Sequence, residues 1–353
     1  MENLLEGAYD LHIHCGPDVV PRSVSGLDMA RRAAARGMRG FAIKAHYDCT
    51  CQQAALVNAL VPEVNTIGTL TMNSTVGGVN PMAVEMAART GARIIWCPTF
   101  DSASQQKYYL ENLPEYIVMQ SKLLGRGVKV PSYCLIDQAG SLTREMSDVL
   151  DLVQEYDLVL ATGHITHPET FALAKEARRR GFRKLLITHA DWSFTHYSIE
   201  EKLALVELGA MIEHTYTSPA LLHSVSWEES FREMRAVGAA HIVASTDLGQ
   251  AKNIFPDEGL QLYAEKILEA GFTREELRQM LPLTTYADYA DVLLPKRADM
   301  LCGEPAIWIL NNRRLPDAWE VKKAASVYAA FLLCKSISKL EMCHFLPLRG
   351  NRK

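Results

Sequence analysis

The chain has 353 residues, of which 48% are hydrophobic and 22% are charged, and its net charge is −4. This composition is typical of a globular protein with one large domain or two smaller ones, and it lacks the overall positive charge of many nucleic-acid-binding proteins. No apolar run approaches the roughly 18–20 residues of a membrane span, and the first ten residues, MENLLEGAYD, lack the pattern of a signal peptide.

The cysteines indicate a reducing compartment. Eight of them are spread thinly along the chain. The one close pair, Cys49 and Cys51, is too tight for a CxxC motif. We therefore expect free thiols and a cytoplasmic protein.

Eight short β-branched or apolar runs follow one another along the chain, and most are separated by amphipathic segments rich in Ala, Leu, Arg and Glu. The runs are Tyr9–His14, Gly40–His46, Asn65–Met72, Ala92–Cys97, Asp157–His164, Lys184–His189, Ala210–Thr215 and His241–Thr246. Strands that alternate with helices predict βαβ units and a parallel sheet. Eight such units predict an α/β fold of the (β/α)8 TIM-barrel type over residues 1–295.

Two segments show the helix signals well. A helix is expected from about Leu27 to a stop at Gly37, and a second one has Pro168 in its first turn and Gly181 at its exit. The long interval between the fourth and fifth runs holds an extra extended segment, residues 128–142, which is expected to form a hairpin or a loop beside the active-site face.

The regular alternation stops after Pro295, where the composition shifts from acidic to basic. Residues 296–353 therefore form a separate C-terminal tail, within which residues 317–340 predict one amphipathic-to-apolar helix. We expect this helix to pack on the barrel or on a second subunit of a homo-oligomer. A helix that lies on a membrane surface is the alternative, because the tail is basic.

Polar residues cluster at the carboxyl ends of the predicted strands. In a parallel barrel these ends meet at one face, where barrel enzymes place their chemistry. Imidazoles and a carboxylate that converge on one point suit zinc or a similar divalent ion. The residues concerned are His12, His14, Lys44, His46, His164, His189, Glu213, His214 and Asp247.

This order of residues resembles the amidohydrolase superfamily of metal-dependent hydrolases. That superfamily carries HxH after its first strand, a His after the fifth, a His after the sixth and an Asp after the eighth. The matching positions here are His12, His14, His164, His189 and Asp247. "DLHIHCGPD" together with "ATGHITHPE" is similar to an uncharacterised bacterial branch of the superfamily, so the resemblance brings no established substrate.

The resemblance implies a metal-dependent hydrolase. By it, His12, His14 and Asp247 bind one ion, and His164 and His189 bind a second or hold substrate and water beside the first. The metal would activate water and polarise a carbonyl, and Asp247 would pass the proton of that water to the leaving group. We expect one ion rather than two, zinc with Mn²⁺ or Fe²⁺ as alternatives. The expected substrate is a small amide, cyclic imide, lactone or ester.

One departure from the superfamily concerns the ligand between two metal ions. Members with two ions usually bridge them with a carbamylated Lys or a Glu after the fourth strand, and this chain has neither there. The thiolate of Cys97 is the candidate bridge, with a small buried side chain as its alternative reading. Lys44 and His46 are expected to contact a substrate anion or oxyanion, and His214 to be a third substrate contact.

Three other functions remain open at this stage. One is a mononuclear zinc decarboxylase of the same superfamily, in which Lys44 would hold the carboxylate. Another is a phosphoesterase or nuclease, for which more acidic ligands and a basic groove are expected. The last is a barrel that binds a small ligand without catalysis.

Overall fold

The computed structural model describes residues 3–112 and 118–281. The chain divides into two units, Met1–Arg297 and Ala298–Lys353. The helices and strands described all belong to the first unit, Met1–Arg297. The predicted C-terminal tail, residues 296–353, lies outside the described residues.

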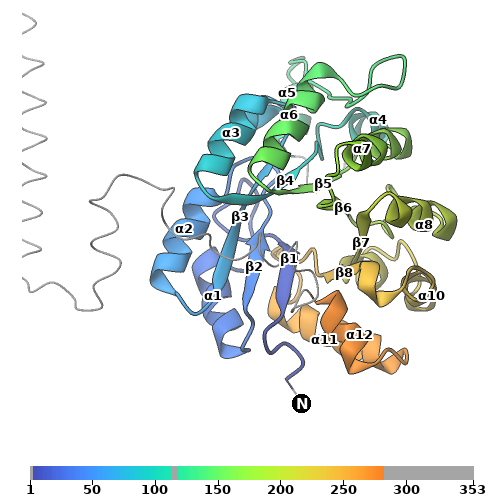
Figure 1. Ribbon diagram of the computed structural model, residues 1–353. Coiled ribbons are helices and arrows are strands. Elements are labelled where there is room, and N and C mark those ends of the chain that lie inside the picture. The colour runs from blue at the N-terminus through green and yellow to red at the C-terminus, as the bar shows by residue number, and fades with distance from the viewer. Residues whose placement is uncertain (1–2, 113–117, 282–353) are drawn as a thin grey trace, which may run out of the picture. The chain divides into compact units, whose positions relative to one another are not determined.

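In this part of the chain, eight parallel strands follow each other around one sheet in sequence order (Figure 1). They are β1 (Tyr9–Ile13), β2 (Gly40–Ile43), β3 (Asn65–Thr71), β4 (Ala92–Trp96), β5 (Val159–Ala161), β6 (Leu185–Ile187), β7 (Ala210–Thr215) and β8 (Ile242–Ser245). Each strand lies within one of the eight predicted runs, and the order confirms the (β/α)8 barrel.

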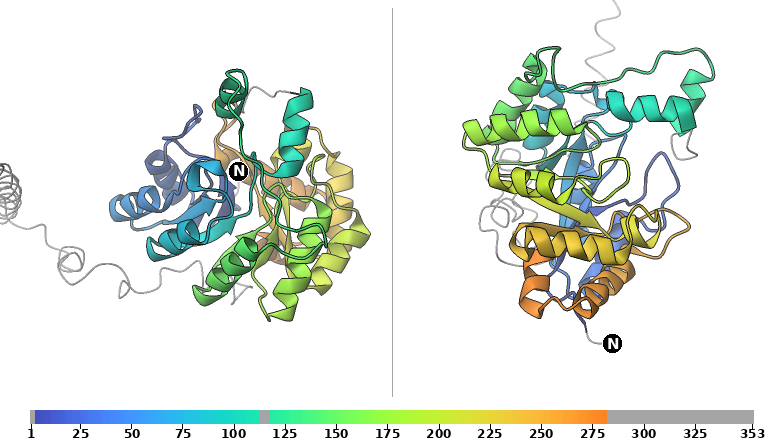
Figure 2. Two further views of the ribbon diagram at one scale, coloured as in Figure 1. Left: turned by 90° about the horizontal axis from the view of Figure 1, so that it is seen from above. Right: turned by 90° about the vertical axis from the view of Figure 1, so that its right-hand side faces the viewer.

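Helices surround the strands on the outside (Figure 2). Those described are α1 (Gly26–Ala35), α2 (Cys51–Leu60), α3 (Pro81–Arg89), α4 (Ala103–Asn112), α5 (Val118–Leu124), α6 (Arg144–Glu155), α7 (His167–Arg179), α8 (Ile199–Glu207), α9 (Thr217–Ala220), α10 (Trp227–Val237), α11 (Pro256–Glu269) and α12 (Arg274–Met280), with short 3₁₀ turns η1 (Ser74–Val76) and η2 (Ala239–His241).

The predicted helix signals are confirmed in α1 and α7. The Ser25 side chain accepts the backbone N–H of Asp28 at the start of α1, and a capping box between Thr166 and Glu169 starts α7. Gly181 follows α7 with a φ of +74°, a conformation that glycine adopts without steric cost. The segment 128–142 is mostly loop, with one isolated antiparallel bridge between Ile136 and Leu142.

The apolar core has two layers, because successive side chains of a strand point to opposite faces. The inner layer fills the barrel with one or two side chains from each of the eight strands, including Ile94 and Trp96 of β4. The outer layer lies between strands and helices and includes Ile95 of β4. The phase of this alternation decides which residues at the strand ends can reach the barrel mouth.

The first strand breaks this alternation with a bulge. Between Asp10 and Ile13, three steps along β1 oppose only two along β2, from Phe41 to Ile43. Leu11 belongs to the inner layer, whereas Ile13 belongs to the outer one. A bulge re-aims the side chains that follow it, and here it turns His12 and His14 toward the barrel mouth.

The barrel closes between β1 and β8 at the same place. The N–H of Asp247 donates to the carbonyl of His12 at 2.8 Å, and the N–H of His14 donates to the carbonyl of Leu248 at 2.7 Å. Gly249 follows with a φ of +128°, and a Cβ there would lie 1.8 Å from the carbonyl oxygen of His14. Only glycine fits this close approach, so the backbone itself fixes the two loops to each other.

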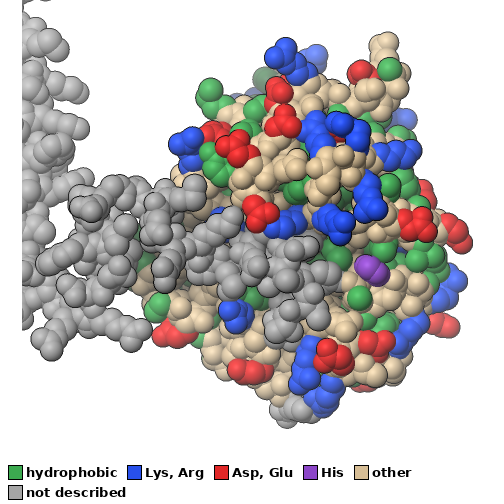
Figure 3. All heavy atoms as spheres, in the orientation of Figure 1, with side chains coloured by type: hydrophobic (Ala, Val, Ile, Leu, Met, Phe, Trp, Pro, Cys, Tyr) green, Lys and Arg blue, Asp and Glu red, His purple; other side chains and the backbone are tan. Residues whose placement is uncertain are grey.

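The surface of the barrel carries charges of both signs. On the face drawn in Figure 3, Lys and Arg are interspersed with Asp and Glu. Among the described helices, none is both long and apolar enough to cross a membrane.

Candidate metal centre

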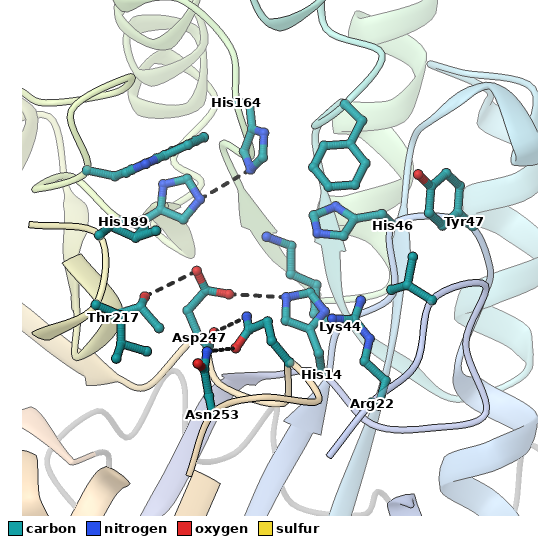
Figure 4. A pocket seen from close by; sticks show the side chains of 16 residues that line it. His14, Arg22, Lys44, His46, Tyr47, His164, His189, Thr217, Asp247 and Asn253 are labelled. Atoms are coloured by element: carbon teal, nitrogen blue, oxygen red, sulfur yellow. Dashed lines mark hydrogen bonds and ion pairs between the residues drawn. The ribbon is translucent and has the colours of Figure 1, made fainter. Parts of the chain in front are cut away.

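A cavity of about 210 Å³ opens at the carboxyl ends of the strands. Loops after seven of the eight strands contribute to its wall, as expected for the catalytic face of a barrel. Figure 4 shows the side chains that point into it. Six of the predicted site residues line this cavity: His14, Lys44, His46, His164, His189 and Asp247.

His12, His14 and Asp247 meet at the floor of the cavity. Oδ1 of Asp247 lies 3.1 Å from Nε2 of His12 and 3.1 Å from Nε2 of His14. One nitrogen or oxygen from each residue lies within 4.8 Å of the others, and within the described residues this is the only group of three or more that could hold a metal ion. Both imidazoles are buried, at 0% and 2% exposure.

Glu213 fixes the tautomer of His12. Its two carboxylate oxygens lie 3.1 and 3.2 Å from Nδ1 of His12, so that this nitrogen carries the proton and donates it. Burial alone raises the pKa of Glu213, but the neighbouring His12 outweighs burial and lowers it. The unprotonated Nε2 of His12 faces Oδ1 of Asp247 at 3.1 Å and Nζ of Lys44 at 3.0 Å. A carboxylate behind a histidine is a common support for a metal ligand.

His164 and His189 form a second pair of imidazoles, with their Nε2 atoms 3.2 Å apart. Nδ1 of His164 donates to the side-chain oxygen of Gln105. Nδ1 of His189 lies 3.2 Å from Oγ1 of Thr195, whose hydroxyl donates to the His189 carbonyl at 2.9 Å and therefore accepts from Nδ1.

These partners place both protons on Nδ1, so two unprotonated Nε2 atoms face each other across 3.2 Å. Two lone pairs at this distance repel each other unless a cation or a proton donor lies beside them. Burial lowers the pKa of His189 to about 4 and that of His164 well below its usual value. Both rings are therefore neutral at pH 7, which is the form that binds metals.

The first three residues fit a cation in the same way. Burial, with the charge of Arg22 second, lowers the pKa of His14 to about 3. Nδ1 of this ring is buried and has no hydrogen-bond partner among the residues that the structure describes. Burial by itself raises the pKa of Asp247, but His12 and His14 outweigh it and hold that pKa well below its ordinary range. Burial and Lys44 lower the pKa of His12, but Glu213 and Asp247 outweigh them and raise it above its ordinary value. Two imidazoles and an ionised carboxylate make a donor set suited to zinc.

Two of these residues have unusual backbone conformations. Asp247 has a φ of +55° and His189 a φ of +28°, in the left-handed region that residues other than glycine rarely adopt. Such strain persists only where the surrounding structure imposes it, and it is concentrated at functional sites. The strain at Asp247 accompanies the hydrogen bond by which its N–H closes the barrel.

Lys44 is a buried cation beside the ligands. Its Nζ lies 3.0 Å from Nε2 of His12 and 4.3 Å from the centre of the Trp96 ring, and the residue is 1% exposed. Burial lowers the pKa of Lys44 to about 8. His46 stacks on the ring of Phe100 at 3.8 Å between ring centres. The structure thus places both predicted substrate contacts in the cavity wall.

The structure does not bring His214 to the cavity. On β7 the inward side chains are Met211 and Glu213, so His214 points outward. Its Nδ1 lies 3.2 Å from the carboxylate of Asp191 and 3.2 Å from the hydroxyl of Ser230 on α10. His214, a predicted substrate contact, thus lies outside the described cavity wall, and the inward residue at this end of β7 is Glu213.

Cys97 also points away from the cavity. Trp96 is the inward residue at the end of β4, and Cys97 lies in the outer core with 0% exposure. Burial raises the pKa of this thiol, which disfavours the thiolate that a bridge between metal ions requires. This geometry supports the alternative reading of Cys97, a small buried side chain.

The segment between β4 and α6 also reaches the cavity wall. The hydroxyl of Tyr47, a lining residue, donates to the side-chain oxygen of Gln120 on α5 at 3.0 Å. Gln120 in turn donates to Asp101 at 3.0 Å. The sequence alone gave no signal for this contact, because α5 lies far along the chain from β2.

Comparison with known protein families assigns the chain. Residues 7–213 match the model of a family of unknown function, DUF6282. The chain belongs to this family. The match spans the segments that carry His12, His14, His164 and His189 and ends at Glu213, before Asp247. None of the curated proteins matches the chain.

Solved structures share the barrel. An amidohydrolase from Pseudomonas aeruginosa superposes with a TM-score of 0.53 at 11% identity, covering 82% of this chain and 96% of that one. The probable dipeptidase PvdM from the same organism gives 0.53 at 9% identity, with 82% and 95% covered. A dipeptidase of the metallopeptidase family M19 gives 0.50 at 12% identity, with 82% and 98% covered. At these identities the likeness establishes the fold, and it agrees with the barrel that the sequence resemblance implied.

Proposed function

We propose that this protein is a metal-dependent hydrolase of the amidohydrolase type, acting on a small amide, cyclic imide, lactone or ester. The observation that carries the proposal is the pair of unprotonated Nε2 atoms on His164 and His189, which face each other beside the group formed by His12, His14 and Asp247. A divalent cation between these atoms would accept the lone pairs of the imidazoles and balance the charge of the Asp247 carboxylate. The fold shared with an amidohydrolase and with dipeptidases agrees with this function.

A divalent ion bound here would supply a polarised substrate carbonyl and a water of lowered pKa. His12, His14 and Asp247 would hold it, with His164 and His189 as ligands of a second ion or as contacts to substrate and water. We expect one ion rather than two, because no residue at the end of β4 offers a bridge. The donor set suits zinc, with Mn²⁺ or Fe²⁺ as alternatives.

Asp247 is the proposed proton carrier. Its Oδ1 faces the two histidines, while Oδ2 accepts the hydroxyl proton of Thr217 at a long 3.4 Å. This weakly engaged oxygen can take a proton from water and release it to a leaving group.

Lys44 and His46 are the proposed substrate contacts. Lys44 is positioned to stabilise negative charge that develops on a substrate oxygen near His12. The ring of His46 is held by Phe100 on one face and by a hydrogen bond between its Nδ1 and Oγ1 of Thr99 at 2.9 Å. Both residues are therefore pre-oriented before substrate enters, which reduces the cost of ordering them.

Two measurements test the proposal together. Protein purified without chelator should contain close to one equivalent of metal, and less than about half an equivalent would contradict it. In a screen of amides, lactones, imides and esters, Asp247→Asn should abolish turnover. If Asp247→Asn retains activity, Asp247 is not the proton carrier.

The buried cation beside the ligands favours one second candidate, a decarboxylase. Lys44 would then hold the carboxylate that is lost. Release of CO2 from aromatic acids, without net hydrolysis, would favour this reaction over the proposed one. A phosphoesterase is less well supported, because Asp247 is the only acidic side chain among the described residues that line the cavity.

A further inference from the structure

One basic residue in the cavity wall, Arg22, has no part in the proposed chemistry. Arg22 lies on the loop between β1 and α1, and its side chain is only 6% exposed. Figure 4 shows the guanidinium beside His14, on the side of the cavity opposite to His189. Burying a guanidinium in a cavity wall costs free energy unless its N–H donors are hydrogen-bonded. Each N–H donor of Arg22 is therefore expected to have a partner, either in the protein or in a ligand.

Asp18 satisfies one edge of this guanidinium. Its Oδ2 accepts from Nε of Arg22 at 2.7 Å and lies 2.5 Å from Nη2, and the Asp18 side chain is 3% exposed. Within the described chain, Nη1 of Arg22 has no hydrogen-bond partner. A guanidinium that is clamped through one edge presents its remaining donors in a fixed direction, which suits the planar oxygens of a carboxylate.

The backbone also holds Arg22 in place. Arg22 pairs with Gln250 in an isolated antiparallel bridge, and the N–H of Ser23 donates to the carbonyl of Gly249 at 2.8 Å. The loop that carries Arg22 is thus joined to the loop that carries Asp247. An anion held by Arg22 would therefore be positioned relative to the metal centre.

The charged groups that line the cavity favour an anion, because the carboxylates of Asp18 and Glu213 lie behind Arg22 and His12 and are not among its lining residues. Among its described lining residues, the basic ones are Arg22 and Lys44, whereas Asp247 is the only acidic one and belongs to the metal group. A bound divalent cation would add further positive charge. Attraction of anions into a confined cavity of this sign is expected.

The rest of the wall is apolar and aromatic. Phe100 and Trp192 come from the loops after β4 and β6, and Leu221 and Leu222 follow α9 at the rim. Trp192 is held edge-on to the rings of His164 and His189, at 5.1 and 4.9 Å between centres. Such a wall accommodates an aromatic or branched apolar group of the ligand.

We infer that Arg22 is the carboxylate-binding residue of this cavity and that the substrates are small carboxylic acids with an aromatic or branched apolar group. The inference rests on the proposed hydrolase function, since it names the substrate class of the same site. The carboxylate is held at Arg22, the apolar group lies against Phe100 and Trp192, and the bond to be cleaved lies between them, at the metal group.

The test compares two probes that differ only in charge, 3-phenylpropionate and 3-phenylpropionamide. Their affinities for zinc-loaded protein are measured by titration calorimetry, without turnover. The carboxylate should bind at least about tenfold more tightly than the amide. Arg22→Gln should remove most of this preference, whereas Arg89→Gln, which removes an exposed arginine on α3, should keep it. Arg22→Lys should retain part of the preference for the carboxylate, because the positive charge remains but the paired N–H donors of the guanidinium are lost.

A second variant distinguishes the loss of the carboxylate contact from misfolding. Arg22→Gln leaves the buried Asp18 unpaired, so Asp18→Asn/Arg22→Gln is measured beside it, and circular dichroism checks that both variants fold. Equal affinity of the two probes for the wild-type protein would overturn the inference. So would an unchanged preference in the folded double variant, because the metal alone would then hold the carboxylate.

The two proposals fail separately. If the preference depends on Arg22 and no substrate is hydrolysed, the ligand class stands and the hydrolase function fails. If neutral substrates are hydrolysed as fast as their carboxylated counterparts and the probes bind equally, the hydrolase function stands and the role of Arg22 is refuted.

Discussion

Glu213 on β7 orients His12 on β1 through hydrogen bonds of 3.1 and 3.2 Å to Nδ1, and both side chains are 0% exposed. The same carboxylate accepts the backbone N–H of His189 at 2.8 Å. One residue therefore supports both halves of the proposed metal centre. It fixes the ring of His12 directly and the backbone of His189 at its unusual φ.

Replacing Glu213 by Ala should weaken metal binding by about 10–100-fold, as is usual when the support of a metal-binding histidine is lost. Glu213→Gln should have a smaller effect, because the amide oxygen can still accept from Nδ1 of His12. Competition for zinc with a chromophoric chelator measures both affinities. Unchanged zinc affinity in a folded Glu213→Ala variant would show that His12 does not need this support or does not bind metal.

Removing the metal should lower the thermal stability of the protein. A ligand present at about 100 times its Kd stabilises the folded state by about 2.7 kcal/mol, which corresponds to a shift of about 4–5 °C in Tm for a domain of this size. A melting curve in chelator, followed by addition of zinc, measures the shift. His14→Ala is the matched control, and its Tm should respond much less to zinc. A wild-type Tm that does not respond to chelator or zinc would contradict the site.

Much of the fold could be predicted from the sequence, because each strand and helix carries its own local signal. The apolar runs located all eight strands, and glycine or proline marked the ends of helices such as α7. The ends of the runs were less certain. The fifth run extends to His164, whereas β5 ends at Ala161, since the polar residues beyond a strand continue the chain into the loop without a break in the pattern.

Two residues that were predicted for the site, His214 and Cys97, lie away from the cavity for one physical reason. Residues at strand ends reach the barrel mouth only if they are in phase with the inner core layer. On β7 that phase selects Glu213 rather than His214, and on β4 it selects Trp96 rather than Cys97. In β4 and β7 the sequence shows this alternation of inward and outward side chains. In β1 it does not, because the bulge after Asp10 changes which side chains point inward.

The outward position of Cys97 leads to a prediction. Cys97→Ala should leave the metal content and the affinity for zinc unchanged, because the thiol lies in the outer core. It should lower the free energy of unfolding by about 1 kcal/mol, the cost of a small cavity. Metal analysis and denaturant unfolding measure the two quantities. A loss of bound metal in the folded variant would restore Cys97 as a ligand.

A buried ion pair outside the site predicts how stability depends on pH. Lys202 on α8 and Glu233 on α10 form a salt bridge, and their side chains are 0% and 2% exposed. The second oxygen of Glu233 accepts from Nε2 of His196 at 2.6 Å. Burial alone raises the pKa of Glu233, but His196 and Lys202 outweigh burial and lower the pKa below its ordinary value of 4.5.

Glu233→Gln should therefore destabilise the protein by about 3 kcal/mol at pH 7, because it leaves the Lys202 ammonium buried without a counter-charge. The stabilisation by Glu233 is present above the pKa of an unfolded glutamate and is lost as pH falls through the lower folded pKa. The difference in free energy of unfolding between wild type and Glu233→Gln should accordingly shrink below about pH 4. Lys202→Met/Glu233→Gln should recover part of the loss at pH 7, since neither charge remains. Urea unfolding at pH 7, 5 and 3.5 measures these differences, and a difference that stays constant over this range would refute the pairing.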